Sequence, residues 1–213
     1  MRVFLTGGTG YIGSRLIPIL LGRGHWVRAL VRPGSESRLP AGCEPAIGNA
    51  LESASLARHV RAGDTVVQLV GVAHPGPSKA ALFRSVDLAS AKASVDAART
   101  AAAAHFVYVS VAQPAPVMKE YVAARAEAEA YLRESALPAT VLRPWYVLGP
   151  GHRWPYAILP LTALLKRLPK TRETALRLDF VTLRQMLDAL ARAVETPHDG
   201  HRVVTAQEIR AGI

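Results

Sequence analysis

The sequence predicts an α/β fold, a doubly wound parallel sheet with a small C-terminal cap. Two observations lead to this fold class. Short apolar runs of strand-like composition alternate with stretches in which apolar residues recur at helical spacing. The first of these runs leads directly into a glycine-rich turn and a helix-like segment. Such alternation implies right-handed crossovers, which place helices on both faces of a parallel sheet.

The predicted elements follow from these patterns in chain order. Strands are expected at residues 2–5, 26–31, 44–47, 65–70, 105–109 and 139–142, with minor strands at 177–181 and 202–204. Helices are expected at residues 12–21, 53–60, 82–103, 120–135, 159–168 and 183–194. We expect one domain over residues 1–213, with residues 145–213 contributing a reduced substrate-side cap.

Composition fits a single compact domain in a reducing compartment. The chain has 213 residues, of which 50% are hydrophobic, enough to bury a substantial core. No apolar run approaches the roughly 20 residues that span a bilayer, and the N-terminus reads as a strand rather than a signal peptide. Cys43 is the single cysteine, which excludes an internal disulfide. We therefore expect a cytoplasmic protein with no membrane partner.

The formal charge of +10 raises the question of a polyanionic partner. Arginines are scattered along the chain, without a dense basic tract or interleaved aromatic residues for base stacking. This distribution argues against nucleic acid, whereas a positive field suits a small anionic ligand. No group of His, Cys and Asp residues has metal-ligand spacing, so no metal is expected.

The glycine-rich turn carries the first functional signal. It comprises Gly7, Gly8, Thr9, Gly10, Tyr11, Ile12 and Gly13. Glycines between a strand and a helix allow a tight turn, close backbone approach to a pyrophosphate, and close packing of the helix on the strand. Two spacings fit, one through Gly8, Gly10 and Gly13 and one through Gly7, Gly10 and Gly13. Either one predicts a dinucleotide held at a helix N-terminus.

The end of the second expected strand predicts which dinucleotide is preferred. Sites for NAD usually carry Asp or Glu there, about 20 residues beyond the glycines, to bind the ribose hydroxyls. This chain has Arg32 instead, and a guanidinium favours a 2′-phosphate through charge and paired hydrogen bonds. We therefore expect NADP(H) to be preferred over NAD(H). Arg28 and Arg38 are candidates to assist.

With these residues in place, the chain resembles the atypical and extended short-chain dehydrogenase/reductases, which have a Rossmann fold and include NmrA-like and epimerase/dehydratase-like proteins. The resemblance covers most of the chain. It rests on the glycine turn and on four further segments, residues 48–51, 68–71, 107–110 and 142–144. It implies that Asn49 faces the adenine, that Val70 and Gly71 line the adenosine ribose, and that Pro144 to Tyr146 line the nicotinamide.

The resemblance also implies a catalytic group of Ser, Tyr and Lys. Ser110 and Tyr121 stand at the first two positions, but Arg125 occupies the position of the lysine, four residues after the tyrosine. The family's lysine holds the nicotinamide ribose and lowers the pKa of the tyrosine. Arginine keeps the positive charge but is bulkier and planar, so the ribose contacts and tyrosine geometry need not carry over. Tyr121 is either a proton donor or a residue that positions a ligand or packs its helix.

An aromatic segment follows the last expected strand before the cap. Trp145, Tyr146, His152 and Trp154 lie within residues 143–154, in a chain with only 6% aromatic residues. They either line a pocket for a flat, apolar substrate or pack the cap over the sheet.

Two function classes remain open from the sequence. The preferred one is an NADPH-dependent oxidoreductase that reduces a small carbonyl, quinone or flavin-like acceptor. The alternative is a non-catalytic NADP(H)-binding redox sensor or assembly subunit, as some relatives of this kind are. A monomer or a homodimer is expected.

Overall fold

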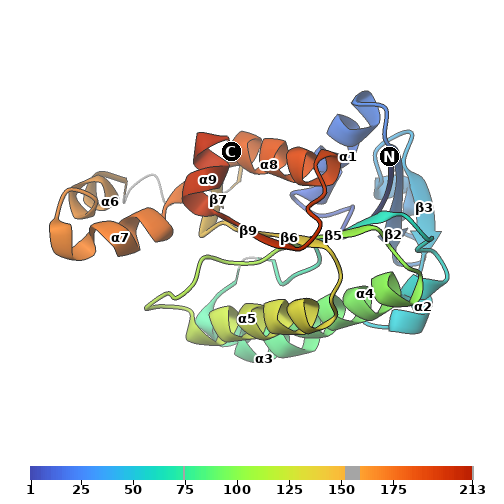
Figure 1. The fold of residues 1–213 in the computed structure, drawn as a ribbon, viewed down its shortest axis with the longest axis horizontal. Coiled ribbons are helices and arrows are strands. Elements are labelled where there is room, and N and C mark those ends of the chain that lie inside the picture. Colours follow the sequence, from blue (N-terminus) through green and yellow to red (C-terminus); the bar gives the residue numbers. More distant parts are fainter. Residues whose placement is uncertain (74, 152–158, 213) are drawn as a thin grey trace.

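A seven-stranded parallel sheet forms the centre of the molecule, as predicted (Figure 1). The computed structural model describes residues 1–73, 75–151 and 159–212. The strand order is β3-β2-β1-β4-β5-β6-β9. The strands are β1 (Arg2–Thr6), β2 (Trp26–Val31), β3 (Glu44–Ile47), β4 (Thr65–Gln68), β5 (His105–Val109), β6 (Ala139–Arg143) and β9 (His201–Thr205).

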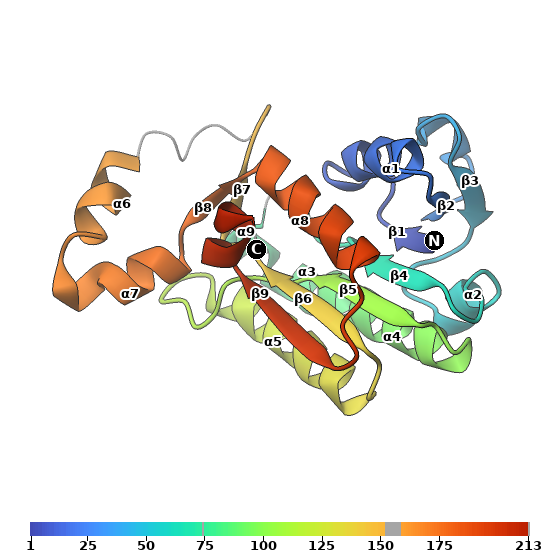
Figure 2. The ribbon, with the colours of Figure 1, turned by 45° about the horizontal axis from the view of Figure 1, so that its top comes forward.

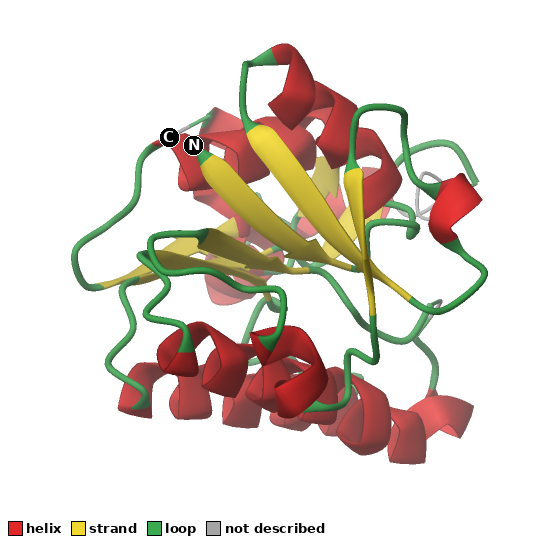
Figure 3. Ribbon diagram, turned by 90° about the vertical axis from the view of Figure 1, so that its right-hand side faces the viewer, coloured by secondary structure: helices red, strands yellow, loops and turns green. Residues whose placement is uncertain are grey.

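Helices cover both faces of this sheet (Figures 1 and 3). One face carries α1 (Gly13–Gly22), α8 (Leu183–Glu195) and α9 (Ala206–Ala211). The other carries α2 (Ser53–Ala57), α3 (Ala80–Leu82), a π-helical turn η3 (Phe83–Leu88), α4 (Ala89–Thr100) and α5 (Lys119–Glu134). Two short 3₁₀ turns, η1 (Glu36–Arg38) and η2 (Pro77–Lys79), lie in the connections. The fold class is therefore confirmed as a doubly wound α/β sheet.

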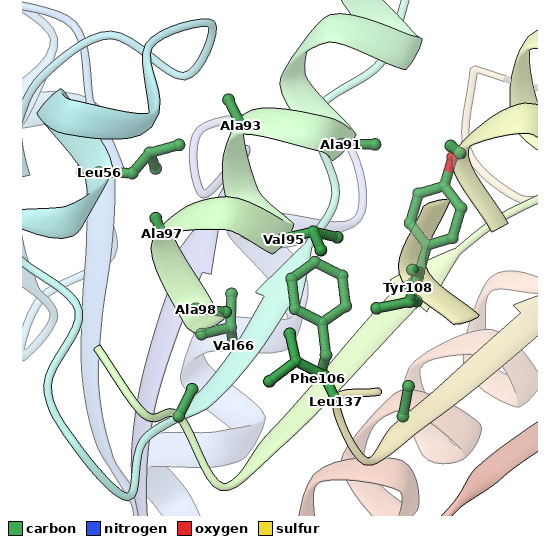
Figure 4. Close-up of a cluster of buried hydrophobic side chains, with 14 of the residues drawn as sticks. Leu56, Val66, Ala91, Ala93, Val95, Ala97, Ala98, Phe106, Tyr108 and Leu137 are labelled. Atoms are coloured by element: carbon green, nitrogen blue, oxygen red, sulfur yellow. The ribbon is translucent and has the colours of Figure 1, made fainter. Parts of the chain in front are cut away.

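Two hydrophobic cores follow from the alternation of side chains along the strands. Val66 and Phe106 point to the face covered by α4, whereas Val67 and Val107 point to the face covered by α1 and α8. Figure 4 shows Val66 and Phe106 beside the alanine-rich side of α4. The surface of α4 that faces the sheet consists mostly of alanine. These small side chains let the helix backbone approach the sheet closely.

The C-terminal part differs from the sequence expectations in several places, and the helices at 169–177 and 206–211 were not expected. The expected strand at 177–181 is β8 (Phe180–Thr182), because Arg177 still belongs to α7 (Pro169–Arg177), a helix with proline in its first turn. The expected minor strand at 202–204 is β9, the edge strand of the main sheet. A short strand that was not expected, β7 (Tyr146–Leu148), pairs in parallel with β8.

The helices between β7 and β8 form an arm beside the sheet. α6 (Leu159–Leu165) and α7 project away from the main body (Figure 2). α8 and β9 follow the arm and return to the sheet, so residues 145–213 supply both an outer segment and part of the central layers. Within the described chain, no helix is long and apolar enough to cross a membrane.

Candidate active site

Two connected cavities lie at the carboxyl ends of the central strands, where β1 is flanked by β2 on one side and β4 on the other. Chain connections leave opposite faces of the sheet at such a switch point, which opens a crevice. The larger cavity, of about 440 Å³, contains Arg32 and is called the Arg32 cavity here. The second, of about 290 Å³, contains Ser110 and is called the Ser110 cavity. Both are lined by Gly7, Gly10, Leu69 and Gly71.

The glycine turn between β1 and α1 forms the shared floor of the cavities. Gly7 has φ 76°, and a Cβ there would lie 2.9 Å from the carbonyl carbon of Leu69. A Cβ at Gly13 would collide with the Gly7 carbonyl oxygen and lie 2.9 Å from the Gly8 Cα. Gly8 faces the other way, and its Cβ would meet Ala29 and Leu39. The structure therefore favours the spacing through Gly7, Gly10 and Gly13, with Gly8 serving helix packing.

The N-terminal end of α1 faces this floor. Tyr11, Ile12 and Gly13 line the Ser110 cavity, and Thr9 lines the Arg32 cavity. The first turn of α1 carries no acidic side chain. Its positive dipole end and N–H groups are thus uncompensated by a carboxylate, as an anion site requires.

The Arg32 cavity has an exposed arginine near its rim. The guanidinium of Arg32 has no hydrogen-bond or ion-pair partner within the described residues. Asn49 and Val70 also line this cavity. The Asn49 side chain accepts from the Leu51 N–H at 3.1 Å and donates to Glu52 at 2.6 Å, so the turn after β3 is fixed.

Arg28, a candidate to assist Arg32, is committed elsewhere. Its guanidinium donates to Glu44 at 3.0 Å and to the His59 carbonyl oxygen at 2.9 Å, and it stacks over Trp26. Its side chain is buried. We assign Arg28 a structural role, and Arg38 is outside the lining of both cavities.

The Ser110 cavity brings together the three residues expected in a catalytic group. Ser110 follows β5, and Tyr121 and Arg125 lie on α5; all three line this cavity. The Ser110 Oγ is buried and has no hydrogen-bond partner among the residues that the structure describes. A buried hydroxyl without a partner is costly, so this atom is suited to a ligand oxygen. The Tyr121 ring packs edge-on against Phe83, with 5.0 Å between centroids.

Arg125 is held on several sides. Its Nη1 donates to the Val109 carbonyl oxygen at 2.7 Å and lies 3.4 Å from the Tyr108 hydroxyl. Its guanidinium carbon lies 5.2 Å from the centre of the Tyr121 ring. Burial alone would lower the pKa of Arg125, but Tyr121, Tyr108 and Asp87 together raise it, so the guanidinium stays charged.

Sequence reasoning missed Asp87, which is fully buried on η3. One carboxylate oxygen accepts from Arg125 Nη2 at 2.5 Å, and the other accepts from the Val72 N–H at 3.0 Å. The signal in the sequence was an acidic residue between Phe83 and Leu88, at a position that the helical pattern assigns to the core. Its partner, 38 residues away, was not identifiable from that pattern.

The substrate-side candidates divide into two groups. Pro144, Trp145 and Tyr146 line the Ser110 cavity, and Tyr146 packs edge-on against Phe180 with 6.2 Å between ring centres. His152 and Trp154 lie outside the described residues. The Ser110 cavity is otherwise walled by apolar side chains, including Val72, Val111 and Val147.

Two curated reductases are similar to this chain in sequence. The chain is 26% identical over 194 residues to a ceramide reductase of Caulobacter vibrioides, covering 90% of this chain and 59% of the relative. It is 29% identical over 171 residues to a 4-hydroxy-2-methyl-3-oxo-4-farnesyl-3,4-dihydroquinoline-1-oxide ketoreductase of Stigmatella aurantiaca, covering 70% of this chain and 51% of the relative. The chain thus spans little more than half the length of these two relatives.

A solved UDP-glucose 4-epimerase of Thermus thermophilus, in complex with NAD, shares the fold. It superposes with a TM-score of 0.68 and 20% identity, over 99% of this chain and 81% of the epimerase. The family described as NAD(P)H-binding matches residues 7–159, well over half of the chain. The chain therefore belongs to the family described as NAD(P)H-binding.

Proposed function

We propose that this chain is an NADPH-dependent reductase of a small, uncharged carbonyl, quinone or flavin-like acceptor. The observation that carries the proposal is that Ser110, Tyr121 and Arg125 line one cavity together with the glycine turn. The reductase names of the ceramide and dihydroquinoline relatives support the reaction class.

The residues of the cleft fit a dinucleotide. The glycine turn leaves room for a pyrophosphate where side chains at Gly7 or Gly13 would collide with backbone, and α1 points its N-terminus at the same place. The Arg32 cavity would hold the adenosine end, with Asn49 and Val70 against the base and ribose. The Ser110 cavity would hold the nicotinamide end beside Pro144 and Tyr146.

Reduction needs a hydride, a proton and a group that polarises the acceptor oxygen. The dihydronicotinamide of the cofactor supplies the hydride. The Ser110 hydroxyl would donate a hydrogen bond to the acceptor oxygen, which would satisfy its buried Oγ. Tyr121 would hold a proton at its phenolic oxygen and transfer it to the alkoxide or quinol oxygen. For a carbonyl, the products are then the alcohol and the oxidised cofactor.

The preference for NADPH rests on Arg32. Its guanidinium lines the adenosine side and has no protein partner in the described part of the chain, so it is available to a 2′-phosphate. A bidentate arginine–phosphate contact is stronger than a neutral hydrogen bond. The solved epimerase was determined with NAD, so the preference has to be measured on this chain itself.

The lining of the Ser110 cavity indicates the class of acceptor. Arg125 is the only charged residue among the described lining residues, and Asp87 neutralises it. A charged substrate would lose its hydration without gaining a counter-charge, which is unfavourable in a pocket of this kind. An apolar acceptor with one reducible oxygen would match the valine walls and the ring of Trp145.

The reaction is tested by turnover together with binding. Wild-type protein is titrated with NADPH and then assayed for NADPH oxidation with a panel of apolar ketones, quinones and flavins. We expect Tyr121→Phe and Ser110→Ala each to lower kcat by about 100-fold or more. A general acid typically contributes on the order of 10²–10⁴-fold to the rate. Tyr131→Phe is the matched control, because Tyr131 also lies on α5 but its hydroxyl donates to Asp96 at 2.7 Å, outside the lining of both cavities.

A protein that binds NADPH tightly, oxidises it with no member of the panel and is unaffected by Tyr121→Phe would contradict the reductase. That result favours the alternative of a non-catalytic NADP(H)-binding redox sensor or assembly subunit. One observation already fits the alternative: Arg125 stands where the family has lysine, and its charge is taken up by Asp87.

Cofactor choice is tested by Arg32→Asp. We expect the NADPH affinity to fall by at least about 10-fold, since a charged hydrogen bond contributes about 1.5–3 kcal/mol, whereas NADH affinity stays level or rises. Arg99→Asp is the control, because Arg99 is exposed on α4 and lines neither cavity. Equal affinity of the wild type for NADPH and NADH would refute the role of Arg32.

A further inference from the structure

Asp87 joins three separate parts of the cleft wall. Its Oδ2 accepts from the Val72 N–H, in the loop that follows β4. Its Oδ1 accepts from Arg125 on α5, and Arg125 in turn donates to the Val109 carbonyl oxygen at the end of β5. The loop after β4, the end of β5 and α5 are thus connected through the buried Asp87–Arg125 pair.

Crowding fixes this arrangement further. Gly71, next to Val72, touches the same pair: a Cβ at Gly71 would collide with Arg125 Nη2 and lie 3.1 Å from Asp87 Oδ1. Gly71 lines both cavities, whereas Arg125 lines the Ser110 cavity alone. A shift of the Asp87–Arg125 pair would therefore move the segment on which both halves of a bound dinucleotide depend.

The pair also leaves one donor for a ligand. Arg125 Nε is buried and has no hydrogen-bond partner in the described part of the structure. The guanidinium is planar and is held at both Nη atoms, so the direction of its Nε–H is fixed as well. A ligand hydroxyl oxygen that reaches this N–H would satisfy it, and a ribose offers acceptors of this kind.

We propose that Asp87 is a positioning residue for the dinucleotide: it orients Arg125 toward the ribose on the nicotinamide side and fixes the Gly71–Val72 backbone. The inference rests on the proposed function for the identity of the ligand. In this arrangement Arg125 acts by geometry. The paired charges cancel, so the cleft gains a directed hydrogen-bond donor and no net positive charge.

The test is a double-mutant cycle on NADPH binding, which requires no turnover. The Kd for NADPH is measured by calorimetry for the wild type, Asp87→Asn, Arg125→Gln and the combined variant. We expect Asp87→Asn to weaken binding by about 10-fold, and the combined variant to bind no more weakly than Arg125→Gln, because coupled neighbours are not additive. Asp96→Asn is the control; Asp96 also joins α4 to α5, through Tyr131, but lies outside both cavity linings.

A purely structural role would give a different pattern, namely a lower urea midpoint for Asp87→Asn with the wild-type Kd in the folded protein, as expected for Asp96→Asn. That pattern would overturn the inference, as would single effects that multiply in the combined variant. Either single variant leaves one buried charge without its partner and could fail to fold. The combined variant has neither charge, and in that case it is the protein measured. A wild-type Kd for the combined variant overturns the inference. A wild type without affinity for NADPH overturns the proposed function and this inference with it.

Discussion

His105 makes folding stability depend on pH in a window that can be calculated. It begins β5, its side chain is fully buried, and its Nε2 lies 3.1 Å from the Thr140 Oγ1. Burial, with a smaller contribution from His198, lowers its pKa from 6.5 to about 4. The Nδ1 has no hydrogen-bond partner in the described residues, so protonation in the folded state gains no acceptor.

The sign and size of this pH dependence of stability follow from proton linkage. Between pH 6.5 and 4 the unfolded chain binds a proton at His105 and the folded chain does not, so stability falls as the pH falls. Above pH 6.5 there is no cost. At pH 5 the loss is about 2 kcal/mol, and below pH 4 it levels off at about 3 kcal/mol, at 1.36 kcal/mol for each unit of pKa difference.

The assay compares wild type with His105→Gln, whose amide retains a group able to pair with Thr140. Free energies of unfolding are obtained from urea titrations followed by circular dichroism at pH 7.5, 6 and 5. The acid-induced losses from other residues are common to both proteins and cancel in the difference. We expect the wild type to lose about 2 kcal/mol more than the variant between pH 7.5 and 5. Parallel losses would refute the account of His105.

Three further outcomes follow from individual residues. Gly13→Ala places a methyl group against the Gly7 carbonyl, so NADPH titration is expected to give a Kd at least about 10-fold higher, with destabilisation of about 1–3 kcal/mol; Gly22→Ala, where a Cβ meets nothing within 4 Å, is the control and retains the wild-type Kd. Cys43, whose pKa is raised by burial from 9.0 to about 11, is expected to react with iodoacetamide at pH 8 on the order of 100-fold more slowly in the folded than in the urea-unfolded chain; equal rates would contradict this. Phe106→Ala removes a fully buried ring from the core and is expected to lower the free energy of unfolding by about 3–5 kcal/mol, measured with urea; a loss under 1 kcal/mol would contradict the packing described.

The central strands of the sheet were predictable because they are rich in apolar and β-branched residues that are buried on both faces. The predicted limits of β2, β3 and β5 agree with the structure, since polar or turn residues bound each run. α9 was missed although its capping box was visible: Thr205 and Glu208 have the spacing in which each side chain binds the other's backbone N–H. The strand β7 has only three residues and pairs with a segment 34 positions away, so local pattern did not predict it.

The site divides in the same way between local and non-local information. The glycine turn is one continuous stretch and Arg32 directly follows β2, so both were recognisable from local sequence, and the structure brings both to the cleft. The choice between Gly7 and Gly8 was decided by tertiary contacts, those of Gly7 with Leu69 and of Gly8 with Ala29. Such contacts depend on which strands become neighbours, and sequence spacing alone does not encode that.

The arginine at position 125 illustrates why a substitution can be interpreted only with its partners. Taken by itself, Arg125 in place of lysine keeps the positive charge in a bulkier side chain. The structure adds a fully buried acid beside it, and an uncompensated charge of either sign at this depth would be strongly unfavourable. Each residue therefore requires the other, and together they change what position 125 contributes, from a mobile positive charge to a guanidinium fixed at both Nη atoms. Replacing Arg125 by lysine would keep the charge balance with Asp87 but lose the planar geometry that also reaches the Val109 carbonyl, so this position in this chain depends on geometry as well as charge.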